Sequence, residues 1–259
     1  MQHITQAGLF GVALLFAAVV GPAAAQTNTV EAAQYRACLA KTESNPDVAY
    51  DDALVWRDQG GGVPAQHCAA VALVALGKYA EAATRLAALA EVSGGRAMAP
   101  ALLGQAGNAW LLAEFPSNAL SVLSAALTTG VQKLAPQEEA DLRIDRARAL
   151  AALERWAEAE NDLGKALSLD PERAAAYVFR ATARRMENKL DLALEDLQLA
   201  LALVPKDPAA LLERGIVYRL QEKPELARAD WLAAIAAEPE GKAAEAARGN
   251  LEKLDLKTQ

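Results

Sequence analysis

The sequence has few of the residues on which strands and catalytic centres depend. Only 5% of its 259 residues are aromatic, and it contains two histidines and two cysteines. Ala and Leu dominate instead, and both are strong helix formers, whereas β-branched and aromatic residues favour strands. The chain has no Gly-rich phosphate loop and no cluster of His, Cys, Asp and Glu at metal-ligand spacing. We therefore expect an all-helical protein without a catalytic, cofactor-binding or metal site.

An excess of positive charge is also missing. The formal net charge is −7 and the isoelectric point is about 5.1. Proteins that bind nucleic acids normally present a basic face to the phosphates. The charge balance therefore argues against a nucleic-acid partner.

Long apolar runs are absent beyond the first 25 residues. Residues 8–21 form an apolar stretch of signal-peptide length, too short for a membrane-spanning helix, and residues 22–25 (Pro-Ala-Ala-Ala) supply an A-x-A cleavage pattern. The preceding residues include His3 but no Lys or Arg, so an uncleaved anchor or a buried helix is the alternative. We interpret residues 1–25 as a signal peptide cleaved after Ala25. This predicts a periplasmic protein with no transmembrane span after cleavage.

The two cysteines suit such a compartment, because disulfides persist in oxidising locations. Cys38 and Cys68 are the only possible pair in the chain. A bridge would close a loop of about 30 residues and stabilise the fold by roughly 3–4 kcal/mol in the chain-entropy model. Two buried free thiols are the alternative. A metal site is not expected, because His67 and Cys68 are neighbours on a helix and point about 100° apart.

A period of 34 residues runs through the second half of the chain. Pro171, Pro205 and Pro239 lie at this step, which indicates one supersecondary unit stacked several times. When the proline is numbered as position 32, positions 8, 20 and 27 of each unit are small and position 24 is large and apolar. In chain order these residues are Ala147, Ala181 and Gly215 at position 8; Ala159, Ala193 and Ala227 at 20; Leu163, Leu197 and Trp231 at 24; and Ala166, Ala200 and Ala234 at 27.

Each unit has the pattern of a helical hairpin. Small residues let two antiparallel helices approach closely, the large residue fills the space beside them, and the proline starts the next helix. The pattern resembles the tetratricopeptide repeat family, with departures at position 4 (Arg143) and position 11 (Leu150 and Arg184). The resemblance implies a right-handed α-solenoid of stacked helix-turn-helix hairpins, of the type found in exported bacterial proteins.

The same rhythm, more weakly marked, extends upstream and downstream of these units. The segment from Gly77 to Ala82 resembles the turn between the two helices of a unit. Residues 241–254 show the helical spacing of apolar residues that is expected of a helix capping the last unit. The predicted organisation is a signal peptide at 1–25, a helical hairpin at 26–62, two degenerate units at 63–133, a linker at 134–139, three full units at 140–241, and a capping helix with a tail at 242–259.

Arginine and aspartate recur together at the 34-residue step. Position 7 is Arg and position 23 is Asp in all three full units, as Arg146 with Asp162, Arg180 with Asp196 and Arg214 with Asp230. In a hairpin that turns near position 15 or 16, positions 7 and 23 lie level with each other. The functional alternative is that these regularly spaced arginines bind phosphate or carboxylate groups of a ligand. We predict structural pairs within each unit.

The resemblance also implies that the concave surface is lined by first-helix positions such as 5, 9 and 12. The residues predicted there to bind a partner are Ile144, Val178, Leu212, Arg148, Thr182, Ile216, Arg185 and Arg219. An apolar row flanked by arginines suits a peptide with apolar side chains and an acidic group. The alternative is that the arginines are solvated surface residues.

Two classes of function follow from these observations. The first is a non-catalytic periplasmic scaffold that binds other proteins of the cell envelope, including as an accessory subunit of an assembly or secretion machine; self-association is a further possibility. The second is an enzyme. The mature chain would have a single His, and the carboxylate pairs Asp51–Asp52 and Glu138–Glu139 are adjacent residues that do not converge on a helix. The sequence favours the scaffold.

Overall fold

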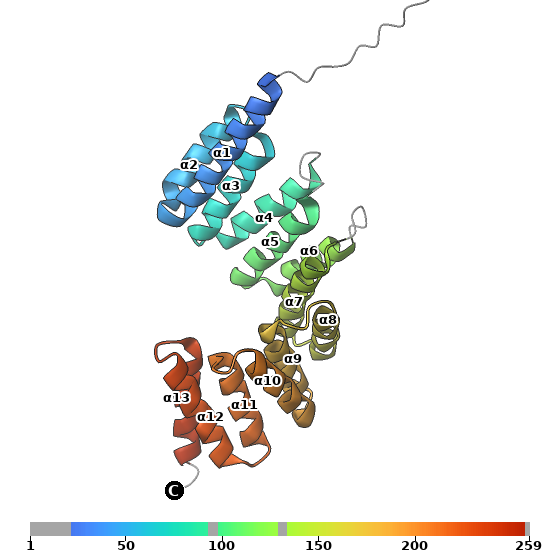
Figure 1. The fold of residues 1–259 in the computed structure, drawn as a ribbon, viewed down its shortest axis with the longest axis vertical. Coiled ribbons are helices and arrows are strands. Elements are labelled where there is room, and N and C mark those ends of the chain that lie inside the picture. Colours follow the sequence, from blue (N-terminus) through green and yellow to red (C-terminus); the bar gives the residue numbers. More distant parts are fainter. Residues whose placement is uncertain (1–21, 93–97, 129–133, 257–259) are drawn as a thin grey trace, which may run out of the picture.

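The computed structural model describes residues 22–92, 98–128 and 134–256, and within these residues the chain forms only helices (Figure 1). The all-helical prediction is confirmed. Residues 1–21, which hold most of the predicted signal peptide, lie outside the described residues. The helices are α1 (Pro22–Ser44), α2 (Pro46–Asp58), α3 (Gly62–Ala75), α4 (Tyr79–Glu91), α5 (Ala99–Leu112), α6 (Pro116–Thr128), α7 (Pro136–Ala152), α8 (Trp156–Leu169), α9 (Ala174–Met186), α10 (Leu190–Leu203), α11 (Pro208–Leu220), α12 (Pro224–Ala237) and α13 (Lys242–Leu256).

The helices follow one another along the long axis of the molecule, from α1 at one end to α13 at the other (Figure 1). Each of the three full units supplies one pair, α7 with α8, α9 with α10, and α11 with α12. The small residues at positions 8, 20 and 27 are all buried between these helices, as are Leu163, Leu197 and Trp231 at position 24. Close helix approach at small residues therefore builds the solenoid, as the sequence pattern predicts.

One turn conformation recurs between the paired helices. Position 15 has a positive φ in five units: Gly77 (72°), Glu114 (63°), Glu154 (59°), Asn188 (59°) and Glu222 (59°). The residue after each donates its backbone N–H to a carbonyl five residues earlier, for example Arg155 to Leu150 at 2.9 Å. This is the six-to-one bond of a Schellman helix end. The degenerate units 63–96 and 100–133 have the same helix end at position 15, so their turns follow the same residue numbering as those of the full units.

The predicted linker at 134–139 is wrong in part. Residues 136–139 form the first turn of α7, and only Leu134 and Ala135 of that segment are non-helical. Pro136 occupies the first helical turn, where its missing N–H is tolerated, and Glu138 Oε2 accepts a hydrogen bond from Ala135 N at 3.1 Å. Proline and carboxylate therefore start this helix four residues before the repeat period does.

The two ends of the array are closed by helices that the sequence anticipates. At the N-terminal end α1 and α2 form the leading hairpin, and Asn45 Oδ1 accepts from Val48 N at 3.5 Å at the start of α2. At the other end α13 packs against α12 and α11 and buries Ala244, Ala247 and Leu254. This helix covers the last apolar face, which repeat arrays require for solubility.

The stacking of the units is asymmetric. Odd-numbered helices contact one another along one side, α1 with α3, α5 with α7, α7 with α9, α9 with α11, and α11 with α13, whereas the even-numbered helices of neighbouring units do not pack closely together. A stack that is tighter on one side curves toward that side. We call the side formed by the odd-numbered helices the inner surface. The contact between α3 and α5 is the exception, because these two helices do not pack closely.

Position 8 of the last unit yields a stability prediction. A methyl group added at Gly215 would overlap the indole ring of Trp231, which is fully buried and donates Nε1–H to Leu212 O at 3.2 Å. We expect Gly215→Ala to lower the free energy of unfolding by about 1–3 kcal/mol through overpacking. Gly249→Ala in α13 is the matched control, because nothing lies within 4 Å of its added methyl, and it should stabilise by roughly 0.5–1 kcal/mol. Urea denaturation of both variants checks this; equal effects would contradict it.

Candidate functional site

All three predicted Arg–Asp pairs are present. Each arginine donates through Nε and Nη2 to both oxygens of the aspartate sixteen residues later, with distances of 2.6 and 2.7 Å for Arg146–Asp162, 2.9 and 2.6 Å for Arg180–Asp196, and 2.7 and 2.7 Å for Arg214–Asp230. The aspartates are buried. The hydrogen bonds to the carboxylates raise the pKa of Arg146 and of Arg214. These arginines are braces within the units and are not available to clamp an anion.

Two departures from the repeat pattern reinforce the braces. Arg184, where the family pattern has an aromatic residue, donates Nη1–H to Asp196 Oδ2 at 2.9 Å and Nε–H to Glu160 Oε1 at 2.8 Å. Arg143 donates to Asp162 Oδ1 at 3.3 Å. Two buried aspartates therefore each accept from two guanidinium groups. In the sequence these arginines are only departures from the repeat pattern. Their contacts show that they stabilise the buried aspartates.

The apolar residues predicted to bind a partner mostly pack inward. Val178 is buried, and Ile144, Leu212 and Ile216 are half-buried against the core. Thr182 Oγ1 donates to Val178 O at 3.1 Å on the same helix. The inner side of the full units is therefore largely filled by its own packing.

Two of the three arginines predicted on this face are engaged within the protein. Arg148 Nη1 donates to Asp145 Oδ1 and to Asn108 Oδ1, both at 2.9 Å, and Arg185 Nε donates to Glu213 Oε1 at 2.5 Å. Arg219 is exposed and, among the described residues, makes no ion pair. The contacts of Arg148 and Arg185 link neighbouring inner helices, α5 with α7 and α9 with α11.

A chain of hydrogen bonds through the buried His67 joins the first three inner helices. Tyr35 on α1 donates its hydroxyl to His67 Nδ1 at 2.7 Å, and His67 Nε2 on α3 lies 2.7 Å from Gln105 Oε1 on α5. An amide oxygen only accepts, so Nε2 carries a proton, and Nδ1 of the neutral imidazole accepts from the Tyr35 hydroxyl. His67 is 6% exposed, and burial lowers its pKa, opposed by the hydrogen bond to Gln105. Nothing in the residue spacing indicates this polar chain.

This buried imidazole makes the stability of the N-terminal units sensitive to acid. The unfolded chain binds a proton near the ordinary histidine pKa of 6.5, whereas folded His67 binds it at lower pH. Its contribution is therefore complete above pH 6.5 and is lost as the pH falls below that value. We expect the ring resonance of His67, assigned with His67→Gln, to titrate below 6.5 in NMR. Titration at or above 6.5 would contradict the burial argument.

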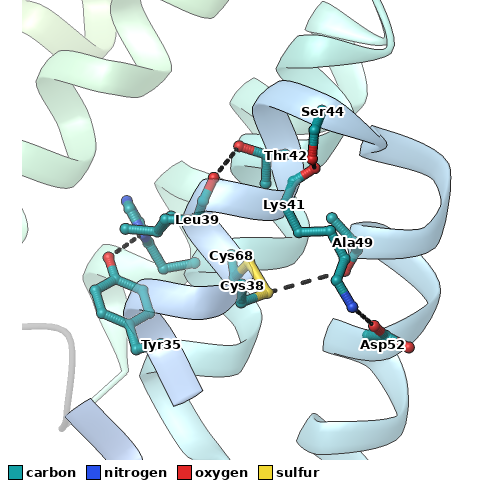
Figure 2. The surroundings of a disulfide bond; sticks show 10 residues. Tyr35, Cys38, Leu39, Lys41, Thr42, Ser44, Ala49, Asp52 and Cys68 are labelled. Carbon is teal, nitrogen blue, oxygen red and sulfur yellow. Dashed lines mark hydrogen bonds and ion pairs between the residues drawn. A yellow bond between two sulfur atoms is a disulfide. The ribbon is translucent and has the colours of Figure 1, made fainter. Parts of the chain in front are cut away.

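A disulfide joins α1 to α3 close to this chain. Cys38 and Cys68 are bonded across a sequence separation of 30 residues, and both are buried (Figure 2). Lys41 and Asp52 form an ion pair between α1 and α2 nearby (Figure 2). The predicted pairing, in which both cysteines lie on first helices of adjacent units, is the one that the structure contains.

Two hollows open on the inner surface. The first hollow has a volume of about 470 Å³ and lies between α3 and α5, whose backbones are widely separated. We call it the α3–α5 hollow. Its walls include Leu39 and Glu43 of α1, Val71 of α3 and Leu112 of α5, with Leu86 of α4 lining it between the inner helices. The second, of about 280 Å³, lies between α5 and α7, and we call it the α5–α7 hollow; Glu138, Asp141, Leu142 and Asp145 line it. Gln105 lines both, so the hollows adjoin.

Comparison with known proteins identifies the architecture. The sequence matches no protein-family model and no curated protein. Solved structures do match: YrrB, described as a TPR protein with an unusual peptide-binding site, is 21% identical, with a TM-score of 0.55 over 78% of this chain and 98% of that chain. A fragment of MamA from Desulfovibrio magneticus RS-1 is 17% identical, with a TM-score of 0.56 over 74% of this chain and 98% of that chain. TTC0263, a thermophilic TPR protein of Thermus thermophilus, is 19% identical, with a TM-score of 0.56 over 72% of this chain and 95% of that chain.

The fold is that of the tetratricopeptide-repeat proteins. In this tetratricopeptide-repeat solenoid the hollows lie over the degenerate units and the start of the first full unit, and not over the well-formed repeats that dominate the sequence pattern. The wide separation of the α3 and α5 backbones accompanies the larger hollow, and residue spacing carries no signal for that separation.

The described segments offer neither a metal site nor a membrane span. Among residues 22–92, 98–128 and 134–256, no group of three His, Cys, Asp or Glu side chains is placed to hold a metal ion. Within the same residues, no helix combines the length and the apolar character that crossing a bilayer demands.

Proposed function

We propose that this protein is an exported scaffold without catalytic activity that binds a segment of another envelope protein on its inner surface. The observation that carries the proposal is the pair of adjoining hollows on the inner helices of a tetratricopeptide-repeat solenoid. Stacked repeats form extended curved surfaces, and proteins use such surfaces to bind other chains.

The geometry of the larger hollow supports binding of a side chain from a partner. Leu39, Val71, Leu86 and Leu112 give it apolar walls, and Gln105 and Asn108 place amide groups at its edge. Recognition sites for peptides combine apolar pockets with a few polar groups that fix orientation. The hollow therefore suits an apolar side chain that projects from an extended or helical segment.

Export is supported by two features of the N-terminal region. Residues 8–25 have the composition of a signal peptide with its cleavage pattern, and Cys38 and Cys68 are joined in a disulfide. Mass spectrometry of the protein isolated from the envelope fraction of its cells tests export. The expected chain begins at Gln26; an intact leader on protein recovered from the cytoplasm would contradict the proposal.

Site-specific photo-cross-linking tests the binding surface. A photoreactive amino acid at Val71 or at Leu112, on opposite walls of the α3–α5 hollow, is expected to yield the same adduct in intact cells. Leu199, which is exposed on α10, is the matched outer position and should not yield it. Equal adducts from inner and outer positions, or none from the inner ones, would reject the inner surface as the binding site.

A further inference from the structure

The two hollows form one groove with a definite sign of charge. We call the α3–α5 hollow and the α5–α7 hollow together the inner groove, since Gln105 lines both. The charged residues that line it, within the described segments, are Glu43, Glu138, Asp141 and Asp145, and these include no Lys or Arg. Asp141 is paired with Arg173 and Asp145 with Arg148, each at 2.9 Å. Glu43 and Glu138 are exposed and lack an ion pair in the described structure.

The remaining negative charges lie one in each of the two hollows. Glu43 belongs to α1 and lines the α3–α5 hollow, and Glu138 belongs to the first turn of α7 and lines the α5–α7 hollow. Leu86 and Ala109, both buried, line the α3–α5 hollow together with Glu43. An occupant that enters both hollows therefore meets apolar walls and two acidic side chains without ion pairs.

This arrangement reverses the sign expected from the arginines on the inner surface. Arg148 and Arg185 are held by Asp145 and Glu213, so they offer no free charge to an acidic partner. Complementary charge increases the rate and selectivity of binding, whereas like charges brought together oppose it. A basic partner is favoured.

We propose that the inner groove binds a protein segment that carries a bulky apolar side chain between basic residues. The apolar side chain occupies the α3–α5 hollow, and Lys or Arg residues of the same segment approach Glu43 in this hollow and Glu138 in the α5–α7 hollow. This inference rests on the proposed function and specifies the chemistry of the partner.

Binding of three labelled synthetic peptides, measured by fluorescence anisotropy, tests the chemistry. The first has a pair of leucines flanked by lysines, the second replaces the lysines by glutamates, and the third replaces the leucines by serines. We expect the first to bind at least about tenfold more tightly than either of the others, and to weaken as salt is added. No binding of the first peptide to the folded protein, or equal binding of the second, overturns the proposal.

Charge reversal separates recognition from damage to the fold. The double variant Glu43→Lys/Glu138→Lys is expected to bind the lysine peptide about tenfold less tightly and to gain affinity for the glutamate peptide. A gain for the reversed peptide cannot arise from unfolding. Glu195→Lys on α10, which is exposed and outside the groove, is the control and should leave both affinities unchanged. Unchanged affinities in the double variant overturn the proposal.

The cross-linking experiment distinguishes failure of this inference from failure of the proposed function. If Val71 and Leu112 yield a common adduct but the captured segment is acidic, the inner surface is the binding site and the basic partner is refuted. If neither position yields an adduct, the scaffold proposal itself fails. The peptide measurements do not depend on the export of the protein.

Discussion

Replacing Asp196 by alanine is expected to lower the free energy of unfolding by about 3–5 kcal/mol, because it removes one partner of a buried ion pair. Asp196 is 1% exposed and accepts hydrogen bonds from both Arg180 and Arg184. Without the carboxylate, Arg180 keeps its charge in a largely buried position. Arg184 retains Glu160, so the loss falls mainly on Arg180.

A double-mutant cycle measures this coupling. We expect Arg180→Ala/Asp196→Ala to be less destabilised than the sum of the two single variants, because the double variant leaves no unpaired Arg180. Asp141→Ala is the control: its side chain is 55% exposed and pairs with Arg173, so the change should cost no more than about 1 kcal/mol. Chemical denaturation of the four proteins of the cycle and of the control gives the values. Strictly additive effects of Arg180→Ala and Asp196→Ala would refute the brace.

Removing the disulfide is expected to have the second-largest effect. The bond between Cys38 and Cys68 spans 30 residues, and the chain-entropy model assigns about 3–4 kcal/mol to a loop of that length. The loop contains α2 and parts of α1 and α3, so the loss should concentrate at the N-terminal end. In a repeat array each unit is stabilised mainly by its neighbours, and distant units keep their stability.

Hydrogen exchange resolves where the stability is lost. In Cys38→Ser/Cys68→Ser, amides of α1 and α2 should exchange faster than in the parent protein, while those of α9 to α12 should not change. The parent protein, unfolded, reduced and refolded with its thiols kept reduced, provides the matched control and should resemble the variant. Unchanged exchange in α1 and α2 would show that packing alone holds this end.

The braces and the hairpins could be predicted from the sequence because they are local and periodic. Arg146 and Asp162 belong to one hairpin, so their spacing alone places them level with each other. The small residues at position 8 carry the same kind of information: the space left by Gly215 is filled by Trp231 of the same unit. Periodic residues within one hairpin determine contacts that need no knowledge of the neighbouring units.

Features that depend on contacts between units could not be predicted in this way. The partners of Arg148 and Arg185 lie on neighbouring helices, at positions where the period holds no regular charge. The chain from Tyr35 through His67 to Gln105 joins three helices of three different units. The start of α7 at Pro136 was missed because local capping residues extend the helix beyond the repeat boundary.

The placement of each brace inside a single unit also bears on how the length of the array can change. Duplication or deletion of residues 174–207 would add or remove Arg180 and Asp196 together, so neither change would leave one member of this brace without the other. The pair of Arg185 with the buried Glu213 is shared between neighbouring units, so deletion of the same residues would leave Glu213 without Arg185. The braces within each unit are therefore preserved when a whole repeat is gained or lost, whereas an insertion between Arg180 and Asp196 would separate these two residues.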